Sequence, residues 1–403
     1  MLRSLCPIAA GSDLLTSVFV FMVDAPHIAP SRTTGAREDP ETLARRLPRG
    51  QAAHRPFRPR RVLLTRAARD WPMAARVAER AAAMGAEIVE LKGDRITGLK
   101  DDDPRAEYRR AKTTLAVTVA SESAMRPEPI PPSADWRFDL ATGCPAHCQY
   151  CYLAGSLKGP PVTRLFANLP EILDRLPPLE GQGRITSTDA ARAAEGTTFE
   201  ASCYTDPLAL EPLSDCLSET VSWFGARNED LSLRFTTKFA DTAALEAARH
   251  GGRTRARFSV NADDIARRFE GGTAPLQSRL DAMGRLARVG YKVGLTVAPI
   301  MPIADWEAAY DSLFAAAAAA LPSGTDVTAE LITHRFTPGS REVLLGWYPA
   351  TDLEMDEAVR TVKRNKFGGR KYVYPAPLMR EMRNVLEGQI ARHLPDAQLL
   401  YWT

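Results

Sequence analysis

The chain has 403 residues, of which 45% are hydrophobic and 25% are charged. The hydrophobic content excludes a disordered chain, and the charge content excludes a membrane-embedded helix bundle. Its 52 lysines and arginines against 49 acidic residues give a net charge of +3, which argues against a protein that coats nucleic acid by bulk charge. Six cysteines are too few for a disulfide scaffold, yet three of them fall between positions 144 and 151. Such clustering in a cysteine-poor chain indicates a metal site.

Residues 1–60 are expected to form a disordered basic arm. Residues 1–61 contain ten arginines against five acidic residues, and Pro, Arg and Ala dominate from Ala29 to Arg61. The apolar segment Leu14–Val23 is too short to span a bilayer and lacks a convincing signal-peptide cleavage site. A solvated arm, or a start codon placed too early, accounts for this segment better than a signal peptide. We therefore expect a cytoplasmic protein with no membrane association.

Residues 61–135 are predicted to form a small N-terminal α/β domain. The strand candidates are apolar runs and the helix candidate has helical periodicity. The predicted strands are Val62–Thr65, Glu87–Leu91 and Lys112–Val119, and the predicted helix is Met73–Met84.

Residues 136–335 repeat a strand–helix unit six times, which predicts a parallel sheet because parallel neighbours need long crossovers. No glycine-rich phosphate fingerprint follows the first strand, so a partial (β/α)6 TIM-type barrel fits better than a dinucleotide fold. The segment 181–197 is interpreted as a loop insertion. The predicted strands are Arg137–Leu140, Thr198–Ser202, Leu231–Thr236, Ala256–Val260, Val293–Ala298 and Val327–Ile332, and the helices are Pro170–Leu176, Glu211–Phe224, Thr242–Arg249, Pro275–Val289 and Asp305–Ala320.

Three cysteines with the spacing Cys-x3-Cys-x2-Cys follow the first barrel strand. Cys144, Cys148 and Cys151 can hold three irons of a cubane cluster and leave the fourth iron open. A structural zinc site would need a fourth ligand, and the nearby His147 has an unusual spacing for that role. Two disulfides are impossible with three thiols. The spacing and its place after a first barrel strand resemble the radical S-adenosylmethionine superfamily, whose open iron binds the amino and carboxylate groups of the cofactor.

The flanks of the cysteine loop narrow this resemblance to one family. The stretches Asp139–Cys144 and His147–Leu153 are similar to the cluster loop of the spore photoproduct lyase family. The same order of blocks is kept from about residue 60 to the C-terminus. The other blocks are Tyr108–Leu115, Phe199–Cys203, Val297–Ile300 and Lys371–Tyr374.

The resemblance implies a reaction and its cofactors. The family repairs 5-thyminyl-5,6-dihydrothymine, a thymine dimer that ultraviolet light forms in dry DNA. A reduced 4Fe–4S cluster cleaves S-adenosylmethionine, and the deoxyadenosyl radical takes a hydrogen atom from C6 of the lesion. The bond between the thymines then breaks, and a cysteine returns a hydrogen atom. The implied partners are DNA that carries the lesion and an external electron donor such as flavodoxin or ferredoxin.

Three residues are candidates for the hydrogen-atom chemistry. Cys203 ends a predicted barrel strand and matches the hydrogen-donor cysteine of the family; a free cysteine is otherwise a small buried hydrophobe. Tyr150 and Tyr152 flank Cys151 and match tyrosines that pass the hydrogen atom on in the family. Two aromatic residues beside a cluster can also serve only to keep water from the iron. Cys216, on a predicted helix face, is expected in the core.

Four further residues match the cofactor-binding positions of the family. Lys238 follows the third barrel strand and matches a lysine that pairs with the cofactor carboxylate, although a strand-exit lysine is often only solvated. Ser259 and Thr205 match hydroxyl positions that contact the cofactor, and Ala298 matches a backbone contact to its adenosine. Thr205 departs from the family, which usually has serine there.

Residues 336–403 are predicted to be a C-terminal extension with a DNA-contacting β-hairpin. The stretch Arg360–Tyr372 holds six basic residues and no acidic residue, and a Gly-Gly turn follows Phe367. Such a run is normally a solvated surface, but a basic hairpin with an aromatic residue can also clamp phosphates and wedge into a duplex. Lys366 and Phe367 stand where the family has an Arg-Tyr pair. The predicted DNA-contacting residues are Lys366, Phe367, Arg370 and Lys371.

Two rival functions remain open on the sequence. The first is a paralogous radical S-adenosylmethionine enzyme that acts on another nucleic-acid lesion or modification. Two features keep this alternative possible: the departure from the family at Lys366 and Phe367, and the 181–197 insertion. The second is a non-catalytic iron–sulfur protein that binds DNA. The presence of Cys203 and Lys238 argues against the second function, because a protein that only binds DNA has no use for a hydrogen donor. The sequence does not indicate an oligomeric state.

Overall fold

The computed structural model describes residues 56–156, 159–364 and 369–403, and these residues belong to one compact unit. Most of the predicted arm, residues 1–55, lies outside the described residues. No helix in the described ranges is long and apolar enough to cross a membrane.

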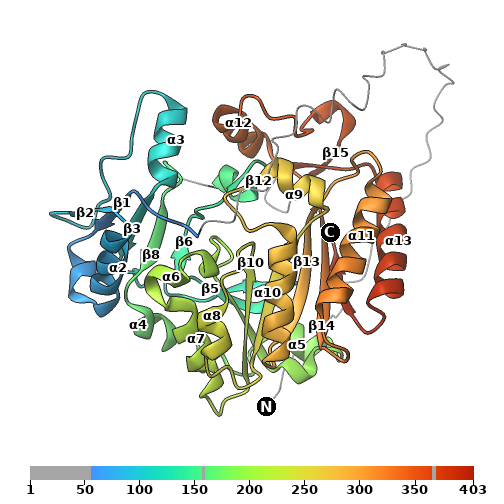
Figure 1. Cartoon of the computed structure of the whole chain (residues 1–403), viewed down its shortest axis with the longest axis horizontal. Helices are drawn as coiled ribbons and strands as arrows, with labels where there is room; N and C mark the ends of the chain where they lie inside the picture. The colour runs from blue at the N-terminus through green and yellow to red at the C-terminus, as the bar shows by residue number, and fades with distance from the viewer. Residues whose placement is uncertain (1–55, 157–158, 365–368) are drawn as a thin grey trace, which may run out of the picture. The chain divides into compact units, whose positions relative to one another are not determined.

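An eight-stranded sheet carries the predicted barrel (Figure 1). Its six central strands are parallel and follow one another in chain order, and each matches one predicted strand. They are β5 (Ala134–Phe138), β9 (Thr197–Ala201), β10 (Leu231–Thr237), β11 (Thr254–Val260), β13 (Lys292–Ile300) and β14 (Val327–Thr333). The sheet is extended by antiparallel β4 (Glu128–Ile130) at one edge and by parallel β17 (Gln398–Trp402) at the other. The curled half-barrel of an α/β protein is therefore confirmed.

The helices that connect the strands pack along the sheet, and the longer ones do so through an apolar stripe. In α10, for example, Leu276, Leu280, Met283 and Leu286 recur at helical spacing and are buried. The predicted helix Glu211–Phe224 is broken at Asp215, whose φ of +56° is left-handed. The helices are α4 (Leu169–Leu173), α6 (Glu211–Ser214), α7 (Cys216–Gly225), α8 (Ala243–Ala247), α9 (Asp263–Phe269), α10 (Leu276–Arg288) and α11 (Trp306–Ala320).

A second sheet of five strands lies beside the half-barrel. It takes two strands from beyond residue 135, so a separate small N-terminal domain is not distinguished from the rest of the compact unit. The predicted strand Lys112–Val119 begins only at Thr114, because Lys112 ends a helix. The strands are β1 (Arg61–Leu64), β2 (Glu87–Glu90), β3 (Thr114–Thr118), β8 (Thr163–Phe166) and β6 (Ala141–Thr142), with helices α2 (Pro72–Ala83) and α3 (Pro104–Lys112).

The segment 181–197 is folded against the edge of the half-barrel. It contains the short helix α5 (Ile185–Thr188) and the 3-10 turn η4 (Ala193–Glu195). Asp135 of β5 accepts the backbone N–H groups of Ile185 and Thr186. The segment therefore packs on the first barrel strand, although most of its described residues are exposed. The other 3-10 turns are η1 (Ala67–Asp70), η2 (Tyr152–Ser156), η3 (Pro177–Leu179), η5 (Pro207–Ala209) and η6 (Glu357–Val359).

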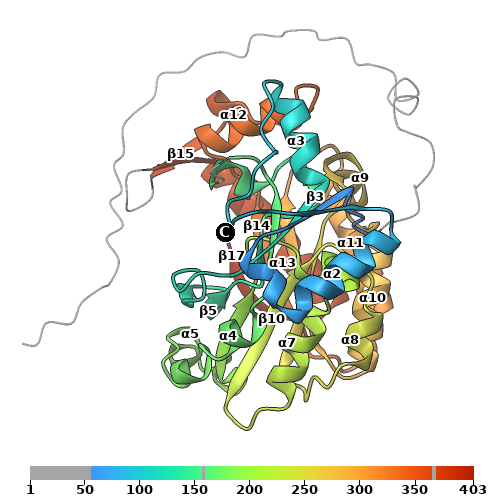
Figure 2. The same ribbon diagram turned by 90° about the vertical axis from the view of Figure 1, so that its left-hand side faces the viewer.

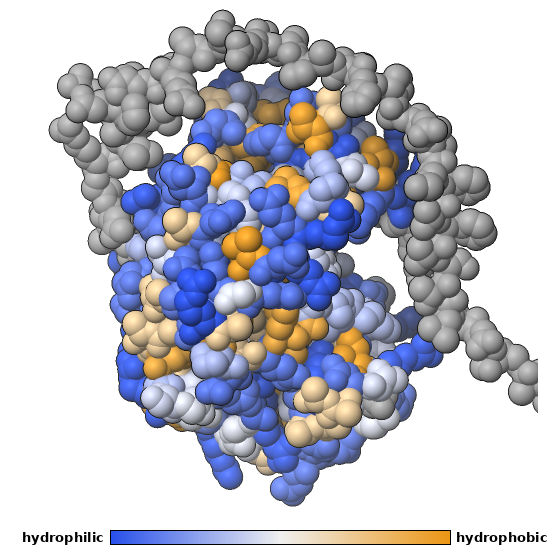
Figure 3. All heavy atoms as spheres, turned by 90° about the vertical axis from the view of Figure 1, so that its right-hand side faces the viewer, coloured by the Kyte–Doolittle hydropathy of each residue, from blue (hydrophilic) through white to orange (hydrophobic). Residues whose placement is uncertain are grey.

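The C-terminal part adds helices and the predicted hairpin to the half-barrel. Helix α12 (Pro338–Trp347) lies near α3, and α13 (Ala376–His393) packs on α11. The antiparallel strands β15 (Thr361–Arg364) and β16 (Arg370–Val373) form the hairpin, which extends away from the body of the molecule near α12 (Figure 2). The face that includes α11 and α13 is mostly hydrophilic, with apolar side chains only scattered over it (Figure 3).

Candidate functional site

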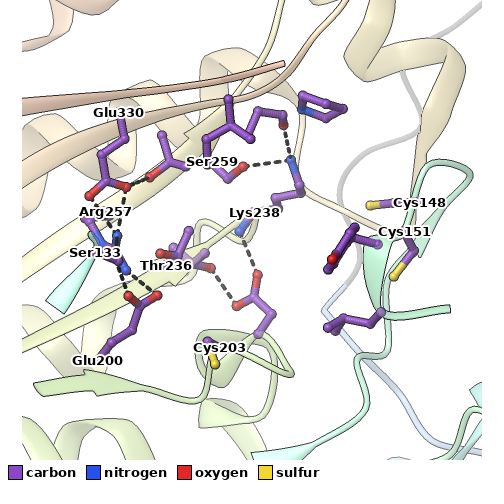
Figure 4. A pocket seen from close by; sticks show the side chains of 18 of the residues that line it. Ser133, Cys148, Cys151, Glu200, Cys203, Thr236, Lys238, Arg257, Ser259 and Glu330 are labelled. Carbon is purple, nitrogen blue, oxygen red and sulfur yellow. Dashed lines mark hydrogen bonds and ion pairs between the residues drawn. The ribbon is translucent and has the colours of Figure 1, made fainter. Parts of the chain in front are cut away.

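One cavity gathers the predicted site residues at the carboxyl ends of the barrel strands, which is where barrels place their chemistry. Its volume is about 490 Å3. Figure 4 shows Cys148 and Cys151 across the cavity from Arg257, with Lys238 between them. The lining includes every predicted cluster ligand, catalytic residue and cofactor-binding residue: Cys144, Cys148, Cys151, Tyr150, Tyr152, Cys203, Thr205, Lys238, Ser259 and Ala298.

The cysteine loop follows β6 and begins at a position that only a glycine can occupy without strain. Gly143 has a φ of +74°, and a Cβ at this position would lie 2.4 Å from the carbonyl oxygen of Val162. A side chain here would both strain the backbone and push the loop away from β8. The glycine thus allows the loop to turn from the second sheet towards the cavity.

Two contacts hold the middle of the loop. Its short strand β7 (His147–Cys148) pairs with β12 (Glu270–Gly271), which follows α9. On the other side, the buried ammonium of Lys112 donates to the carbonyl oxygen of Cys144 at 2.5 Å and also to that of Ala146. The loop is therefore anchored to the half-barrel and to α3 at once.

The donor set of the loop fits a cubane cluster. In the described part of the chain, no three His, Cys, Asp or Glu side chains surround a single metal position. The cysteines of a cubane each bind a different iron, so their thiols stand farther apart than the ligands of one zinc ion. Burial raises the pKa of both Cys144 and Cys148 to about 12, so these thiols keep their protons until a metal displaces them.

His147 does not line the cavity with the three cysteines and makes a hydrogen bond elsewhere. Its Nδ1 lies 2.9 Å from the hydroxyl of Tyr108, which also contacts the hydroxyl of Tyr348. Burial, together with the charge of Lys112, lowers the pKa of His147 to about 4, so the ring is neutral at physiological pH. The hydrogen bond to Tyr108 gives His147 a structural role in linking the cysteine loop to α3 and α12.

Three of the four predicted cofactor-binding residues meet at one ammonium group. The Nζ of Lys238 donates to Oγ of Ser259 at 2.9 Å and to the carbonyl oxygen of Ala298 at 3.3 Å. It also forms an ion pair of 3.0 Å with Glu270. Only 15% of the lysine side chain is exposed, and the residue lines the cavity. This arrangement suits the recognition of a small carboxylate ligand.

The fourth residue, Thr205, offers an unused polar atom at the cavity wall. Its Oγ1 is buried and has no hydrogen-bond partner among the described residues. A buried hydroxyl without a partner is costly, and a ligand in the cavity would satisfy it. The orphaned hydroxyl is thus a second observation that fits a polar cofactor.

Asp206 is a site residue that the sequence reasoning missed. Its carboxylate accepts the backbone N–H of Lys238 at 2.7 Å and the hydroxyl of Thr237 at 2.8 Å. Burial raises the pKa of Asp206 to about 6 although these hydrogen bonds act in the opposite direction. The residue ties the end of β9 to the end of β10 and so fixes Thr205 beside Lys238. Its position directly after Thr205, before a proline, is the signal that could have identified it.

Glu270 is a second site residue that the sequence reasoning missed. It contacts Tyr150 and not Tyr152, so the two predicted tyrosines have different surroundings. Its buried carboxylate accepts the hydroxyl of Tyr150 and forms an ion pair of 2.6 Å with Arg279. Burial alone would raise the pKa of Glu270, but the charges of Arg279 and Lys238 lower it to about 2. Tyr150 is accordingly buried, whereas Tyr152 is 57% exposed and lines the cavity mouth beneath Arg335. The Gly-Gly pair that follows Glu270 was the available sequence signal for this close approach.

Cys203 lies at the opposite side of the cavity from the cysteine loop (Figure 4). It follows Ser202, whose φ of +58° turns the chain at the end of β9. Burial raises the pKa of Cys203 to about 12, and the nearby carboxylate of Asp139 acts in the same direction. The thiol is therefore neutral at physiological pH. A neutral S–H group is the form from which a hydrogen atom can be donated.

Charged residues fill the interior of the half-barrel beneath the cavity, which the apolar strand patterns did not indicate. Arg257 donates to Glu330 at 2.8 Å and pairs with Glu200, and Arg234 pairs with Glu330 at 2.9 Å. Arg234, Arg257 and Glu330 are each about 1% exposed. The ion pairs cross from β9 to β14 and give the cavity a rigid, polar floor.

The two predicted DNA-contacting residues that the structure describes, Arg370 and Lys371, do not line the cavity. Arg370 and Lys371 face Arg364 and Lys363 across the hairpin, and Lys366 and Phe367 lie outside the described residues. Like charges opposite each other destabilise a strand pair. Burial and the charges of Arg335 and Lys363 lower the pKa of Lys371. A polyanion bound along the hairpin would relieve this repulsion.

Comparison with known proteins agrees with the motifs. The sequence model of a family described as spore photoproduct lyase matches residues 57–403. Spore photoproduct lyase of Bacillus subtilis (strain 168) is 36% identical over 352 residues, which cover 86% of this chain and 99% of that protein. The lyase of Geobacillus sp. (strain Y412MC61) is 37% identical over 352 residues, which cover 87% and 100% of the two chains.

Solved structures show the same fold. A spore photoproduct lyase variant with bound AdoMet and dinucleoside spore photoproduct superposes with a TM-score of 0.77 at 34% identity, covering 87% of this chain and 100% of that chain. A spore photoproduct lyase complexed with dinucleoside spore photoproduct gives a TM-score of 0.77 at 35% identity, with the same coverage. The chain belongs to the spore photoproduct lyase family.

Proposed function

We propose that this protein is a radical S-adenosylmethionine lyase that reverses the spore photoproduct, 5-thyminyl-5,6-dihydrothymine, to two thymines in DNA. The observation that carries the proposal is the single cavity that joins three loop thiols, the ammonium of Lys238 and the thiol of Cys203. A cluster loop, a carboxylate-binding cation and a hydrogen donor are the three parts that this reaction needs. Family membership supports the same reaction.

The residues of the loop and the cavity wall would hold the cofactors. Cys144, Cys148 and Cys151 supply three thiolates to a 4Fe–4S cluster. Lys238 and the unpartnered hydroxyl of Thr205 offer a cation and a hydrogen-bonding group to S-adenosylmethionine. When bound together and reduced, these cofactors supply a carbon-centred radical that can abstract a hydrogen atom.

The chain itself positions the lesion chemistry. Cys203 stands across the cavity from the cluster loop, so a lesion in the cavity would have one face towards each. Its thiol gives a hydrogen atom to the product thymine radical, because an S–H bond is weaker than the C–H bond formed. Tyr152, at the cavity mouth, and Tyr150, held by Glu270, are the phenols that can pass the hydrogen atom back towards the cofactor.

DNA would approach through the hairpin. Arg370 and Lys371 lie on its second strand, and Lys366 and Phe367 belong to its turn by sequence. The pairs of basic residues can bind the phosphates of a distorted duplex. The lesion must leave the base stack to enter the cavity. The proposed partners are lesion-bearing DNA and an external one-electron donor such as flavodoxin or ferredoxin. We infer that the protein acts in the cytoplasm, where thiols remain reduced and chromosomal DNA is present.

Anaerobic reconstitution provides the test. The protein is loaded with iron and sulfide and is incubated with S-adenosylmethionine, a reductant and an oligonucleotide that carries the spore photoproduct. We expect restored thymines in the oligonucleotide, quantified by chromatography and mass spectrometry, and no product when the cofactor is left out. Release of deoxyadenosine without repair would contradict the assigned lesion and favour a related enzyme that acts on another nucleic-acid substrate.

A further inference from the structure

Lys112 is a buried charge that the proposed reaction does not use. It ends α3 within the Tyr108–Leu115 block, and only 7% of it is exposed. Long cationic side chains are almost never buried to this extent unless a counter-charge accompanies them. The surroundings of this ammonium therefore need an explanation.

The contacts of Lys112 are all with neutral groups. Its Nζ donates to the carbonyl oxygen of Cys144 at 2.5 Å and to that of Ala146, and it lies 5.8 Å from the centre of the Tyr108 ring. Among the residues that the structure describes, no carboxylate forms an ion pair with it. Carbonyl dipoles and an aromatic face offset only part of the cost of removing a full charge from water.

The position of the ammonium points to the missing negative charge. Both of its carbonyl partners belong to the loop that carries the three predicted cluster ligands. Iron-bound thiolates are negatively charged, and one-electron reduction of a cluster adds a further negative charge. A fixed positive charge at the loop would stabilise the reduced state more than the oxidised state.

We propose that Lys112 is the counter-ion of the iron–sulfur cluster and that its charge raises the reduction potential of the cluster. The inference rests on the proposed function, because it requires a cluster on Cys144, Cys148 and Cys151. It assigns a role to the Tyr108–Leu115 block, none of whose residues lines the cavity. Lys112 acts through the cluster as a positioning and electrostatic residue.

The test compares the reduction potential of the reconstituted protein with that of Lys112→Met, which removes the charge at similar side-chain length. Iron and sulfide are measured per chain, and the potential is determined anaerobically by mediated redox titration followed by electron paramagnetic resonance. We expect the equilibrium constant for one-electron reduction to fall about tenfold or more, which corresponds to a potential about 59 mV more negative. Lys112→Arg keeps the charge and should restore the potential.

Lys92→Met is the matched control, because Lys92 is an exposed lysine of the same N-terminal part of the chain. It should leave both iron content and potential as in the wild type. If Lys112→Met does not fold, as judged by circular dichroism, Lys112→Gln removes the charge while keeping a hydrogen-bond donor, and the same shift is expected.

The outcomes separate this inference from the proposed function. A fully loaded Lys112→Met or Lys112→Gln protein with the wild-type potential contradicts the inference and leaves the proposed function standing. If the wild-type protein takes up a cluster and the Lys112 variants show the shift, but the wild-type protein does not repair the lesion, only the proposed function is contradicted. A wild-type protein that takes up no cluster contradicts both.

Discussion

At the scale of single residues, the protonation state of Cys203 decides what its thiol can do. A cysteine that acts as a nucleophile needs a lowered pKa, because the thiolate is the reactive form. Burial and the neighbouring Asp139 instead raise the pKa of Cys203 to about 12. The thiol therefore keeps its hydrogen across the physiological pH range. This environment suits a hydrogen-atom donor and disfavours nucleophilic catalysis.

Replacement of this thiol should separate the two halves of the reaction. In Cys203→Ala we expect S-adenosylmethionine to be cleaved and the lesion to be opened, whereas the yield of intact thymine should fall because the product radical receives no hydrogen atom. Product analysis by mass spectrometry would show adducts in place of thymine. Cys216→Ala serves as the control, because Cys216 is a buried core thiol on α7. Thymine yields equal to those of the wild type would remove Cys203 from the mechanism.

At the scale of elements, Asp215 joins the second, five-stranded sheet to the half-barrel. Its left-handed backbone separates α6 from α7, and its carboxylate accepts from Arg80 at 2.7 Å and from Arg76 at 2.9 Å, both on α2. The hydrogen bond from Arg80 is the largest cause of the lowered pKa of Asp215. A carboxyl whose pKa is lowered in the folded state stabilises the fold above its unfolded pKa, and this stabilisation is lost as the pH falls through the folded value.

The pH dependence of stability should reveal this contact. We expect Asp215→Asn to lower the free energy of unfolding by about 1 kcal/mol at neutral pH, since the pair is partly exposed. The difference from the wild type should stay constant down to about pH 4 and shrink below it, because the wild-type carboxyl then becomes protonated. Urea titrations across this range provide the measurement. The exposed Glu90, which pairs with Arg69, gives the control Glu90→Gln. A pH-independent difference would show that the ion pairs are not the cause.

The hairpin is the second element with a testable role. The double variant Arg370→Gln and Lys371→Gln removes two charges that oppose Arg364 and Lys363 across the strands. If both contact phosphates, duplex affinity should fall most at low salt, and the slope of log affinity against log salt should decrease by about 0.9 for each lost contact. Fluorescence anisotropy at several salt concentrations measures both. Arg383→Gln, at an exposed residue of α13, is the control. An unchanged slope would identify the hairpin as an ordinary solvated surface.

At the scale of the whole molecule, the parts that the sequence predicted are those governed by local pattern. The six barrel strands are apolar runs followed by helices, so their order could be predicted. Helix α9 was missed because it has only seven residues, of which Ile265, Ala266 and Phe269 are buried, too few to show a helical period. The buried position of Glu270 depends on partners that are distant in sequence, and the Gly-Gly pair that follows it indicates a close approach of the chain but not those partners. The cysteine spacing, in contrast, was visible because all three thiols lie on one loop.

The charged interior of the half-barrel is the feature that links these scales. Arg234, Arg257, Glu200 and Glu330 come from four different strands, yet they form one network below the cavity. Burial alone would raise the pKa of Glu330, but the charges of Arg257 and Arg234 lower it. The carboxyl group is therefore ionised in the fold. The network fixes the relative positions of strands whose ends carry Cys203, Lys238 and Ser259.

Removal of one member should therefore affect the whole fold. In Glu330→Ala, two buried guanidinium groups lose their shared carboxylate, and we expect the free energy of unfolding to fall by about 3–5 kcal/mol. Glu246→Ala, which breaks the more exposed pair with Arg285 on the outer helices, should cost no more than about 1 kcal/mol. Denaturant titration of both variants without cofactors measures the difference. Equal losses would mean that the interior ion pairs contribute no more than surface pairs, and that apolar packing alone holds the strand ends around the cavity.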